Sequence, residues 1–262
     1  MAANLAIVIS SCDLYSDCWK PLFHSIKKYW SDCPYPIYLI CNEKDSDDEM
    51  VKAIKVGEHL GWGSNTEKAL HHVNEEYVLY LQEDYFLGSP MSTQAVEDHV
   101  KFCIENNVDY IRLEAPYRDS SPWPTNGDYS VDSIDKKYAL CLQPSIWKKS
   151  TLHKFCIEGW TGWDYEAKIC QYVKDNNIDI KSVVVNSNRK PAIGFPMVEG
   201  TGIRKGIWTR EGYKYLIENG FVSEANGRKV EGKFMSWCMR QHHPLLRIPC
   251  AVIIRIMQKC MK

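Results

Sequence analysis

Three continuous apolar runs constrain the fold of this chain more than any other feature. Leu5–Ser10, Pro36–Cys41 and Tyr77–Leu81 are rich in β-branched and aromatic residues and lack polar alternation, which is the pattern of strands buried on both faces. Between the first two runs, apolar residues recur at helical spacing: Trp19, Leu22, Phe23, Ile26 and Trp30. Strands that alternate with helices predict an α/β fold with a mostly parallel sheet flanked by helices, whose ligand sites lie at the carboxyl ends of the strands.

Further along the chain the same alternation continues. Ser64 and Glu67 have the spacing of a capping box that opens a helix, and a second helix is expected near Ala95–Ile104. The segment 110–114 and the segment 180–185 are predicted strands, and Tyr138–Leu142 is expected to be another strand that runs into QPSIWKK. The loop APYRDSSPWPTNGD between them is too polar to be part of a core.

Composition excludes several classes of protein. The 262 residues carry 32 Lys+Arg and 33 Asp+Glu, so no excess of positive charge is available to hold nucleic acid. With 45% hydrophobic residues, 12 prolines and 15 glycines, the chain is not disordered. The 11 cysteines contain no CxxC pair and the first residues have no basic region before the apolar run, so we expect reduced thiols and a cytoplasmic protein.

Polar residues follow the predicted strands. Glu83 and Asp84 come directly after Tyr77–Leu81 and Gln82, which is where a sheet presents a site for a hard divalent cation on a diphosphate. The alternative is that the two carboxylates only terminate the strand and solvate the loop.

Asp13 and Tyr15 lie just past the first strand. A carboxylate there can accept an N–H from a nucleobase, and a phenol ring can stack on the base. Alternatively, Asp13 or Asp17 caps the helix that follows.

Asp164 and Glu166 begin a predicted helix beside Trp160 and Trp163. One of these carboxylates can act as general base on a hydroxyl that docks against the indole surface, which suits a sugar ring. The alternative is that Thr161 and Asp164 form a capping box and the acidic residues only favour the helix N-terminus.

Arg204 and Lys205 stand between glycines in GTGIRKGIW, where backbone N–H groups and two cations can surround a pyrophosphate, although a plain solvated turn fits as well. No GxxxxGK[ST] or GxGxxG motif follows a strand. The histidine pairs at 71–72 and 242–243 lack HExxH spacing, and we interpret them as ordinary surface residues.

Taken in order over residues 5–220, the segments SSCDLYSD, WGSNTEKAL, EEYVLYLQEDYFL, LQPSIWKK and GWTGWDYE resemble bacterial GT-A-type nucleotide-sugar glycosyltransferases of capsule and lipopolysaccharide gene clusters. This resemblance implies a GT-A-like, Rossmann-like domain. It implies that Ser11, Asp13, Tyr15, Trp62, Ser64, Glu83, Arg204 and Lys205 bind the nucleotide sugar, that Asp84 binds the metal, and that Glu166 or Asp164 is the general base. The usual Asp-x-Asp motif is replaced by Gln82-Glu83-Asp84, which weakens the expected metal site.

The implied reaction is transfer of a sugar from a nucleoside diphosphate donor, a UDP-sugar, to a hydroxyl of a saccharide acceptor, with inversion and with Mn²⁺ or Mg²⁺ as cofactor. A sugar-phosphate nucleotidyltransferase is the enzymatic alternative, but it usually has a glycine-rich basic loop after the first strand, which SSCDLYSD lacks. A non-catalytic scaffold module of a membrane polysaccharide assembly is the alternative from another class. The oligomeric state is left open by the sequence.

The last 37 residues differ from the rest in charge. Residues 226–262 carry eight Lys/Arg against the single acid Glu231. We expect a catalytic domain over 1–232 and a basic amphipathic tail over 233–262. In this tail a helix with Pro249 in its first turn places Arg247, Arg255 and Lys259 on one arc. Such a helix can lie on an anionic membrane surface near a lipid-linked acceptor, peripheral to the cytoplasmic face of the inner membrane, or pack on its own domain.

Overall fold

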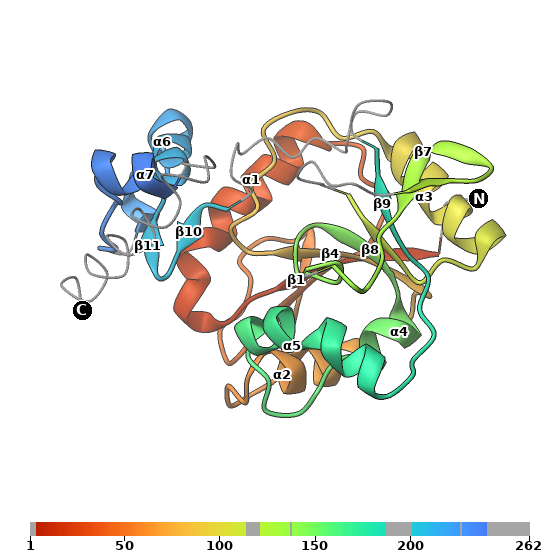
Figure 1. Cartoon of the computed structure of the whole chain (residues 1–262). Coiled ribbons are helices and arrows are strands. Elements are labelled where there is room, and N and C mark those ends of the chain that lie inside the picture. The colour runs from red at the N-terminus through yellow and green to blue at the C-terminus, as the bar shows by residue number, and fades with distance from the viewer. Residues whose placement is uncertain (1–3, 114–120, 137, 187–200, 226, 240–262) are drawn as a thin grey trace. The chain divides into compact units, whose positions relative to one another are not determined.

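The computed structural model describes residues 4–113, 121–136, 138–186, 201–225 and 227–239. The chain divides into two compact units, residues 1–196 and residues 197–262, and each is described by itself. In the first unit a nine-stranded sheet has the strand order β3-β2-β1-β4-β8-β5-β9-β7-β6 (Figure 1). Its strands are β1 Leu5–Ser10, β2 Ile37–Cys41, β3 Val51–Lys55, β4 Tyr77–Gln82, β5 Tyr110–Arg112, β6 Ser121–Trp123, β7 Asn126–Val131, β8 Ser145–Lys148 and β9 Ser182–Val185.

The first half of the sheet is parallel, as the three apolar runs predict. β1 lies between β2 and β4 and pairs in parallel with both, and β2 pairs in parallel with β3. β8 is antiparallel to both of its neighbours, β4 and β5, whereas β5 and β9 are parallel. All five residues of β2 and the first five of β1 and β4 are buried, which confirms that these strands are covered on both faces.

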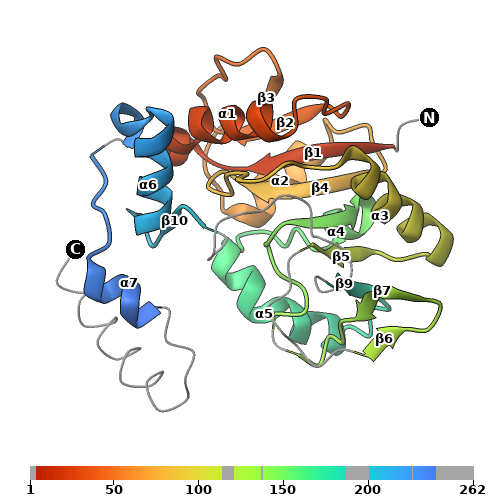
Figure 2. The same ribbon diagram turned by 90° about the horizontal axis from the view of Figure 1, so that it is seen from above.

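Helices cover both faces of this sheet, which confirms the predicted α/β architecture. The helix α1 Trp19–Tyr29, preceded by the 3₁₀ helix η1 Asp13–Cys18, lies on the same face as α3 Thr93–Asn106, and the two meet where the Met91 N–H donates to the Tyr29 carbonyl. α2 Trp62–Leu70, α4 Lys149–Lys154 and α5 Gly162–Asp175 cover the other face (Figures 1 and 2). A buried cluster joins these three helices to the sheet, and it includes Ala6, Val8, Val78, Tyr80, Trp147, Leu152, Phe155, Tyr165, Ile169 and Val173.

The predicted strand Tyr138–Leu142 is wrong, because the strand in this region is β8, beginning at Ser145. Ala139, Leu140 and Leu142 are buried but belong to turns and bends. Tyr138 has a φ of 63°, in the left-handed region, which a strand does not allow. The apolar side chains of residues 139–142 are therefore buried without forming a strand, and strand pairing with β4 and β5 begins only at Ser145.

The capping box expected at Ser64 and Glu67 is also wrong. α2 begins two residues earlier, at Trp62, with Gly61 as its N-cap. A contact distant in sequence is the reason: the Ser64 hydroxyl accepts from the Gly159 N–H at 3.2 Å, and the Gly63 N–H donates to the Trp160 carbonyl at 2.9 Å. The start of α2 is therefore fixed to the loop that leads into α5.

The second unit contains the hairpin β10 Ile203–Arg204 and β11 Ile207–Trp208, then α6 Arg210–Asn219, the 3₁₀ helix η2 Val222–Ala225 and α7 Lys233–Met239. Trp208 is its central buried side chain, and its indole N–H donates to the Ala225 carbonyl at 3.2 Å. The predicted amphipathic helix after Pro249 lies outside the described residues, as do His242 and His243. Within the described ranges no helix combines the length and the apolar character needed to cross a bilayer.

Candidate functional site

The carboxyl ends of β1, β2 and β4 meet at one edge of the sheet. Ser10 at the end of β1 is paired with Gln82 at the end of β4, and Asn42 follows the last residue of β2. The polar residues that follow β1 and β4 in the sequence therefore leave the sheet at the same edge, as the parallel order predicts.

Asp13 joins the loop after β1 to the loop after β2. Its carboxylate accepts three backbone N–H bonds, from Asn42 at 2.8 Å, Glu43 at 2.9 Å and Lys44 at 3.0 Å. The Asn42 side chain returns a bond by accepting from the Asp13 N–H at 3.2 Å. Burial opposes the charge of Asp13, but the three N–H bonds outweigh it and lower the pKa of this carboxyl.

The carboxylate of Asp13 is thus committed mainly to loop geometry. It makes no capping bond on the helix that follows, because the N-cap of η1 is Cys12 and has no side-chain cap. Two carboxylate oxygens offer about four acceptor positions, and three are used by backbone N–H groups. The remaining position suits one N–H of a ligand.

Other residues of the segment SSCDLYSD lie near the contact between Asp13 and the loop after β2. Ser11 Oγ accepts from the indole N–H of Trp19 at 2.8 Å, and Tyr15 lies half-buried in η1. Lys44 Nζ donates to Ser16 Oγ at 2.6 Å and to the Asp13 carbonyl at 3.4 Å. Asn42 and Lys44 were not among the residues expected from the sequence, although Asn42 directly follows a strand and the same rule could have found it.

Trp62 is a core residue. Only 9% of it is exposed, its indole N–H donates to Tyr80 Oη at 2.8 Å, and its ring lies 4.6 Å from that of Tyr165. Ser64 contacts the loop before α5 through Gly159. Both residues, predicted to lie near a nucleoside, are seen here to dock α2 on the sheet and on that loop.

Asp84 and Glu166 come from distant parts of the sequence and act on the same buried phenol. Asp84 is 5% exposed and follows β4, whereas Glu166 is half-buried on the second turn of α5. The pKa of Tyr85 is raised well above its ordinary value by burial first and then by the charges of Asp84 and Glu166, among other neighbours. The charges of the metal candidate and of the general-base candidate therefore both act on Tyr85.

Glu166 has the environment of a base. Its Oε1 accepts from the Leu142 N–H at 3.1 Å. Burial raises the pKa of Glu166 and this hydrogen bond only partly offsets the effect. A carboxylate with a raised pKa is a stronger proton acceptor than an exposed one.

Asp164 has the opposite environment. It forms a full capping box with Thr161, as the alternative interpretation predicted, and its Oδ1 also pairs with Lys168 at 2.6 Å. The bond from Lys168 and then those from Thr161 lower the pKa of Asp164 to about 2. Asp164 is a helix cap and a weak base, so Glu166 is the better candidate for proton transfer. Next to this cap, Trp163 is 71% exposed.

Glu83 directly follows β4, and its charge contributes, after burial, to raising the pKa of Cys12 and of Tyr80. In the second unit, Arg204 pairs with the buried carboxylate of Glu231 at 3.3 Å, and Lys205 and Gly206 form the hairpin turn with φ of 52° and 81°. Arg204 therefore contributes to the packing of its own unit, and the glycine-basic segment is a tight turn.

No family model matches this chain, and no curated protein matches it in sequence. Solved structures similar to it include TarS of S. aureus, with a TM-score of 0.39 and 15% identity over 59% of this chain and 30% of that chain. A cytidylyltransferase from Leptospira borgpetersenii has a TM-score of 0.42 and 12% identity over 88% of this chain and 100% of that chain. Mannosyl-3-phosphoglycerate synthase from Rubrobacter xylanophilus has a TM-score of 0.35 and 14% identity over 56% and 54%. The matched region of TarS is thus less than a third of that protein.

Proposed function

We propose that this chain is a GT-A-like glycosyltransferase that moves a sugar from a nucleoside diphosphate donor, a UDP-sugar, to a hydroxyl of a saccharide acceptor in surface polysaccharide synthesis of the capsule or lipopolysaccharide kind. The observation that carries the proposal is the buried carboxylate of Asp84 just after β4, together with the half-buried Glu166 on α5, whose pKa is raised by burial. One carboxylate stands at a strand exit, where a diphosphate site is expected. The other has a raised pKa on a helix that presents an exposed indole.

A divalent cation fits these residues. Mg²⁺ and Mn²⁺ are commonly held by one or two carboxylates together with substrate phosphate oxygens, and Asp84 with the adjacent Glu83 offers such a pair. When bound, the cation neutralises charge on the leaving diphosphate. Gln82 replaces the first carboxylate of the usual motif, so the phosphate oxygens supply a larger share of its ligands.

The chemical step assigned to the chain's own residues is proton transfer. Glu166 accepts the proton of the acceptor hydroxyl, whose oxygen forms a bond to the anomeric carbon as the bond from that carbon to the diphosphate oxygen breaks. The nucleoside diphosphate leaves with its bonding electrons, and the sugar is transferred with inversion. The loops held by Asp13 would contact the base and ribose, with Tyr15 stacking on the base, and Trp163 would form an apolar platform for the acceptor ring.

Product analysis with a panel of nucleotide sugars tests this proposal. A glycosyltransferase releases free nucleoside diphosphate from one donor when an acceptor is present, and Glu166→Gln slows the release by roughly 10²- to 10⁴-fold while donor binding persists. A nucleotidyltransferase instead releases pyrophosphate from a nucleoside triphosphate and a sugar phosphate. A scaffold module shows no heat of binding for UDP with or without Mn²⁺ in isothermal titration.

We also propose that the tail 233–262 holds the enzyme on an anionic membrane near a lipid-linked acceptor. Phe234 and Trp237 on α7 support this, since they are 52% and 47% exposed and their rings stack at 6.0 Å. Aromatic residues beside basic ones are typical of helices that lie in a membrane interface. Deleting 245–262 should release the protein from anionic liposomes without loss of donor hydrolysis, and equal binding by the truncated chain would contradict the proposal.

A further inference from the structure

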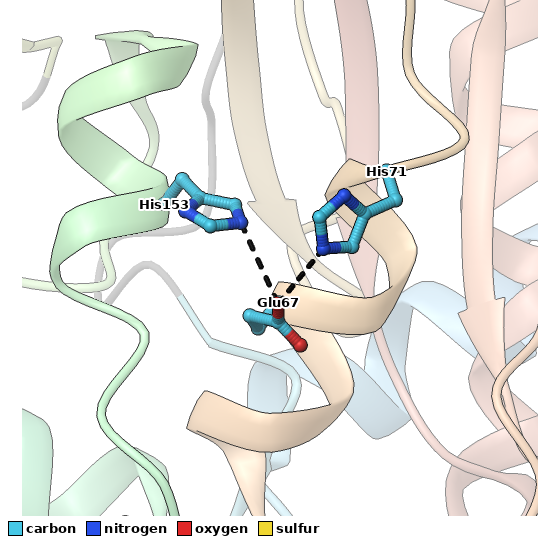
Figure 3. A group of neighbouring side chains, drawn as sticks. All are labelled: Glu67, His71 and His153. Carbon is cyan, nitrogen blue, oxygen red and sulfur yellow. Dashed lines mark hydrogen bonds and ion pairs between the residues drawn. The ribbon is translucent and has the colours of Figure 1, made fainter.

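Three potential metal ligands converge on the face of the sheet that α2 and α4 cover. Glu67 and His71 are one helical turn apart on α2, and His153 comes from α4. Both imidazoles point toward Glu67 (Figure 3), with His71 Nε2 2.8 Å and His153 Nε2 3.6 Å from the same oxygen, Oε1. The two rings are 5.1 Å apart and nearly perpendicular.

The distances fit a metal ion with little movement. Zn²⁺ binds nitrogen and carboxylate oxygen at about 2.0–2.2 Å in tetrahedral geometry, which puts neighbouring ligand atoms about 3.3 Å apart. The distances from Glu67 Oε1 to the two imidazole nitrogens, 2.8 and 3.6 Å, lie on either side of this value. All three ligand atoms lie within 4.8 Å of one another. Changes of about half an ångström bring these two separations to the tetrahedral value, and the two imidazole nitrogens need to approach each other by at most about 1.5 Å. The three side chains would then occupy three corners of the tetrahedron and leave the fourth for water.

The chemistry of the ligands selects the class of metal. Imidazole nitrogen with a single carboxylate suits Zn²⁺ and related transition metals, whereas Mg²⁺ and Ca²⁺ prefer oxygen ligands alone. Glu67 and His71 by themselves are an ordinary exposed ion pair of the i, i+4 kind. His153 changes that interpretation, because a second helix brings another imidazole nitrogen to the same carboxylate oxygen.

We propose that Glu67, His71 and His153 form a Zn²⁺ site that is separate from the cation site at Asp84. The proposal does not depend on the glycosyltransferase function. The ion would link α2 to α4, the helix that leads into the segment 155–161, against which Gly63 and Ser64 already pack. It would therefore act as a structural clamp that holds the start of α2 against the loop leading to Glu166.

Metal titration of the full chain, purified without a histidine tag and stripped with a chelator, tests the proposal. Zn²⁺ should bind with a stoichiometry of one in competition with a chromophoric chelator, and Mg²⁺ should not displace it. Zn²⁺ should also raise the Tm of the protein, because it binds the folded state. His71→Ala, His153→Ala and Glu67→Gln should each weaken Zn²⁺ binding by more than the roughly 10- to 100-fold that loss of an outer-shell partner costs.

His72→Ala is the matched control. His72 is the exposed neighbour of His71 and is not part of the cluster, so its removal should leave both the affinity and the Tm shift unchanged. Circular dichroism and the Tm of each metal-free variant confirm folding. Zn²⁺ binding that survives in His153→Ala, or that His72→Ala weakens equally, would overturn the proposal, as would the absence of stoichiometric binding to the folded wild-type chain.

Discussion

Gly63→Ala is expected to destabilise the protein although alanine is the better helix former. Gly63 is the second residue of α2, and a Cβ at this position would lie 2.0 Å from the carbonyl oxygen of Ile157 and 2.9 Å from its carbonyl carbon. Since real Cβ contacts essentially never fall below 3.0 Å, the helix and the loop must separate by about 1 Å. Both partners are backbone, so no flexible side chain can move to make room.

The size of the effect follows from three contributions. Overpacking costs about 1–3 kcal/mol, and losing the hydrogen bond from Gly63 N–H to Trp160 O costs about 1 kcal/mol more. The higher helix propensity of alanine returns about 0.5–1 kcal/mol. We therefore expect the free energy of unfolding to fall by about 1–3.5 kcal/mol. Because Trp62 and the loop before α5 move with this contact, transfer activity should fall as well.

Urea unfolding followed by tryptophan fluorescence measures this change, with Gly162→Ala as control. Gly162 is the first residue of α5, and a Cβ there meets only the flexible Leu142 side chain, at 3.3 Å. Gly162→Ala should be neutral or slightly stabilising. If Gly63→Ala is as stable as the wild-type chain, helix propensity outweighs the close approach and the packing described between α2 and residues 157–160 is incorrect.

Three other substitutions probe the candidate site. Asp84→Ala should abolish transfer and weaken binding of the donor with Mn²⁺, and Asp84→Asn, which keeps the buried shape, should do the same; full turnover in both would remove Asp84 from the site. Glu166→Gln should lower kcat by roughly 10²- to 10⁴-fold with unchanged donor affinity. In the wild-type enzyme the rate should decrease as the pH is lowered, and it should do so at a pH above the ordinary pKa range of a glutamate, because burial raises the pKa of Glu166. A loss of stability with unchanged specific activity would contradict that role. Asp13→Asn should cost about 1 kcal/mol of stability at neutral pH. The difference in stability between wild type and variant should shrink as the pH falls through the lowered pKa of Asp13, since the protonated acid also loses its charge-assisted hydrogen bonds. A difference that does not depend on pH would exclude the carboxylate charge as its cause.

Local sequence predicted the features that depend on local interactions. The buried strands β1 and β4, and the capping box of Thr161 and Asp164, follow from apolar runs and from a spacing of three residues. The edge at which Asp84 emerges follows from the alternation of strands and helices.

Contacts between distant residues account for what was missed. The partners of Asp13 lie 29 to 31 residues away, and the acceptor that determines where α2 begins is Trp160. His153 reaches Glu67 only because α2 and α4 pack together, so the spacing of histidines in the sequence contained no sign of the cluster. The chemical type of a site residue was thus easier to predict from the sequence than the distant residues that it contacts.

The position of β8 in the sheet has a consequence for folding during synthesis on the ribosome. β4 pairs with β8 rather than with β5, so its second edge stays open until residues 145–148 have been made. That is roughly 60 residues after β4, or about 3–12 s at the usual speed of a ribosome. During this interval the apolar edge YVLYL is a template for pairing with other nascent chains. A chaperone that covers this edge during these seconds should therefore raise the yield of folded protein.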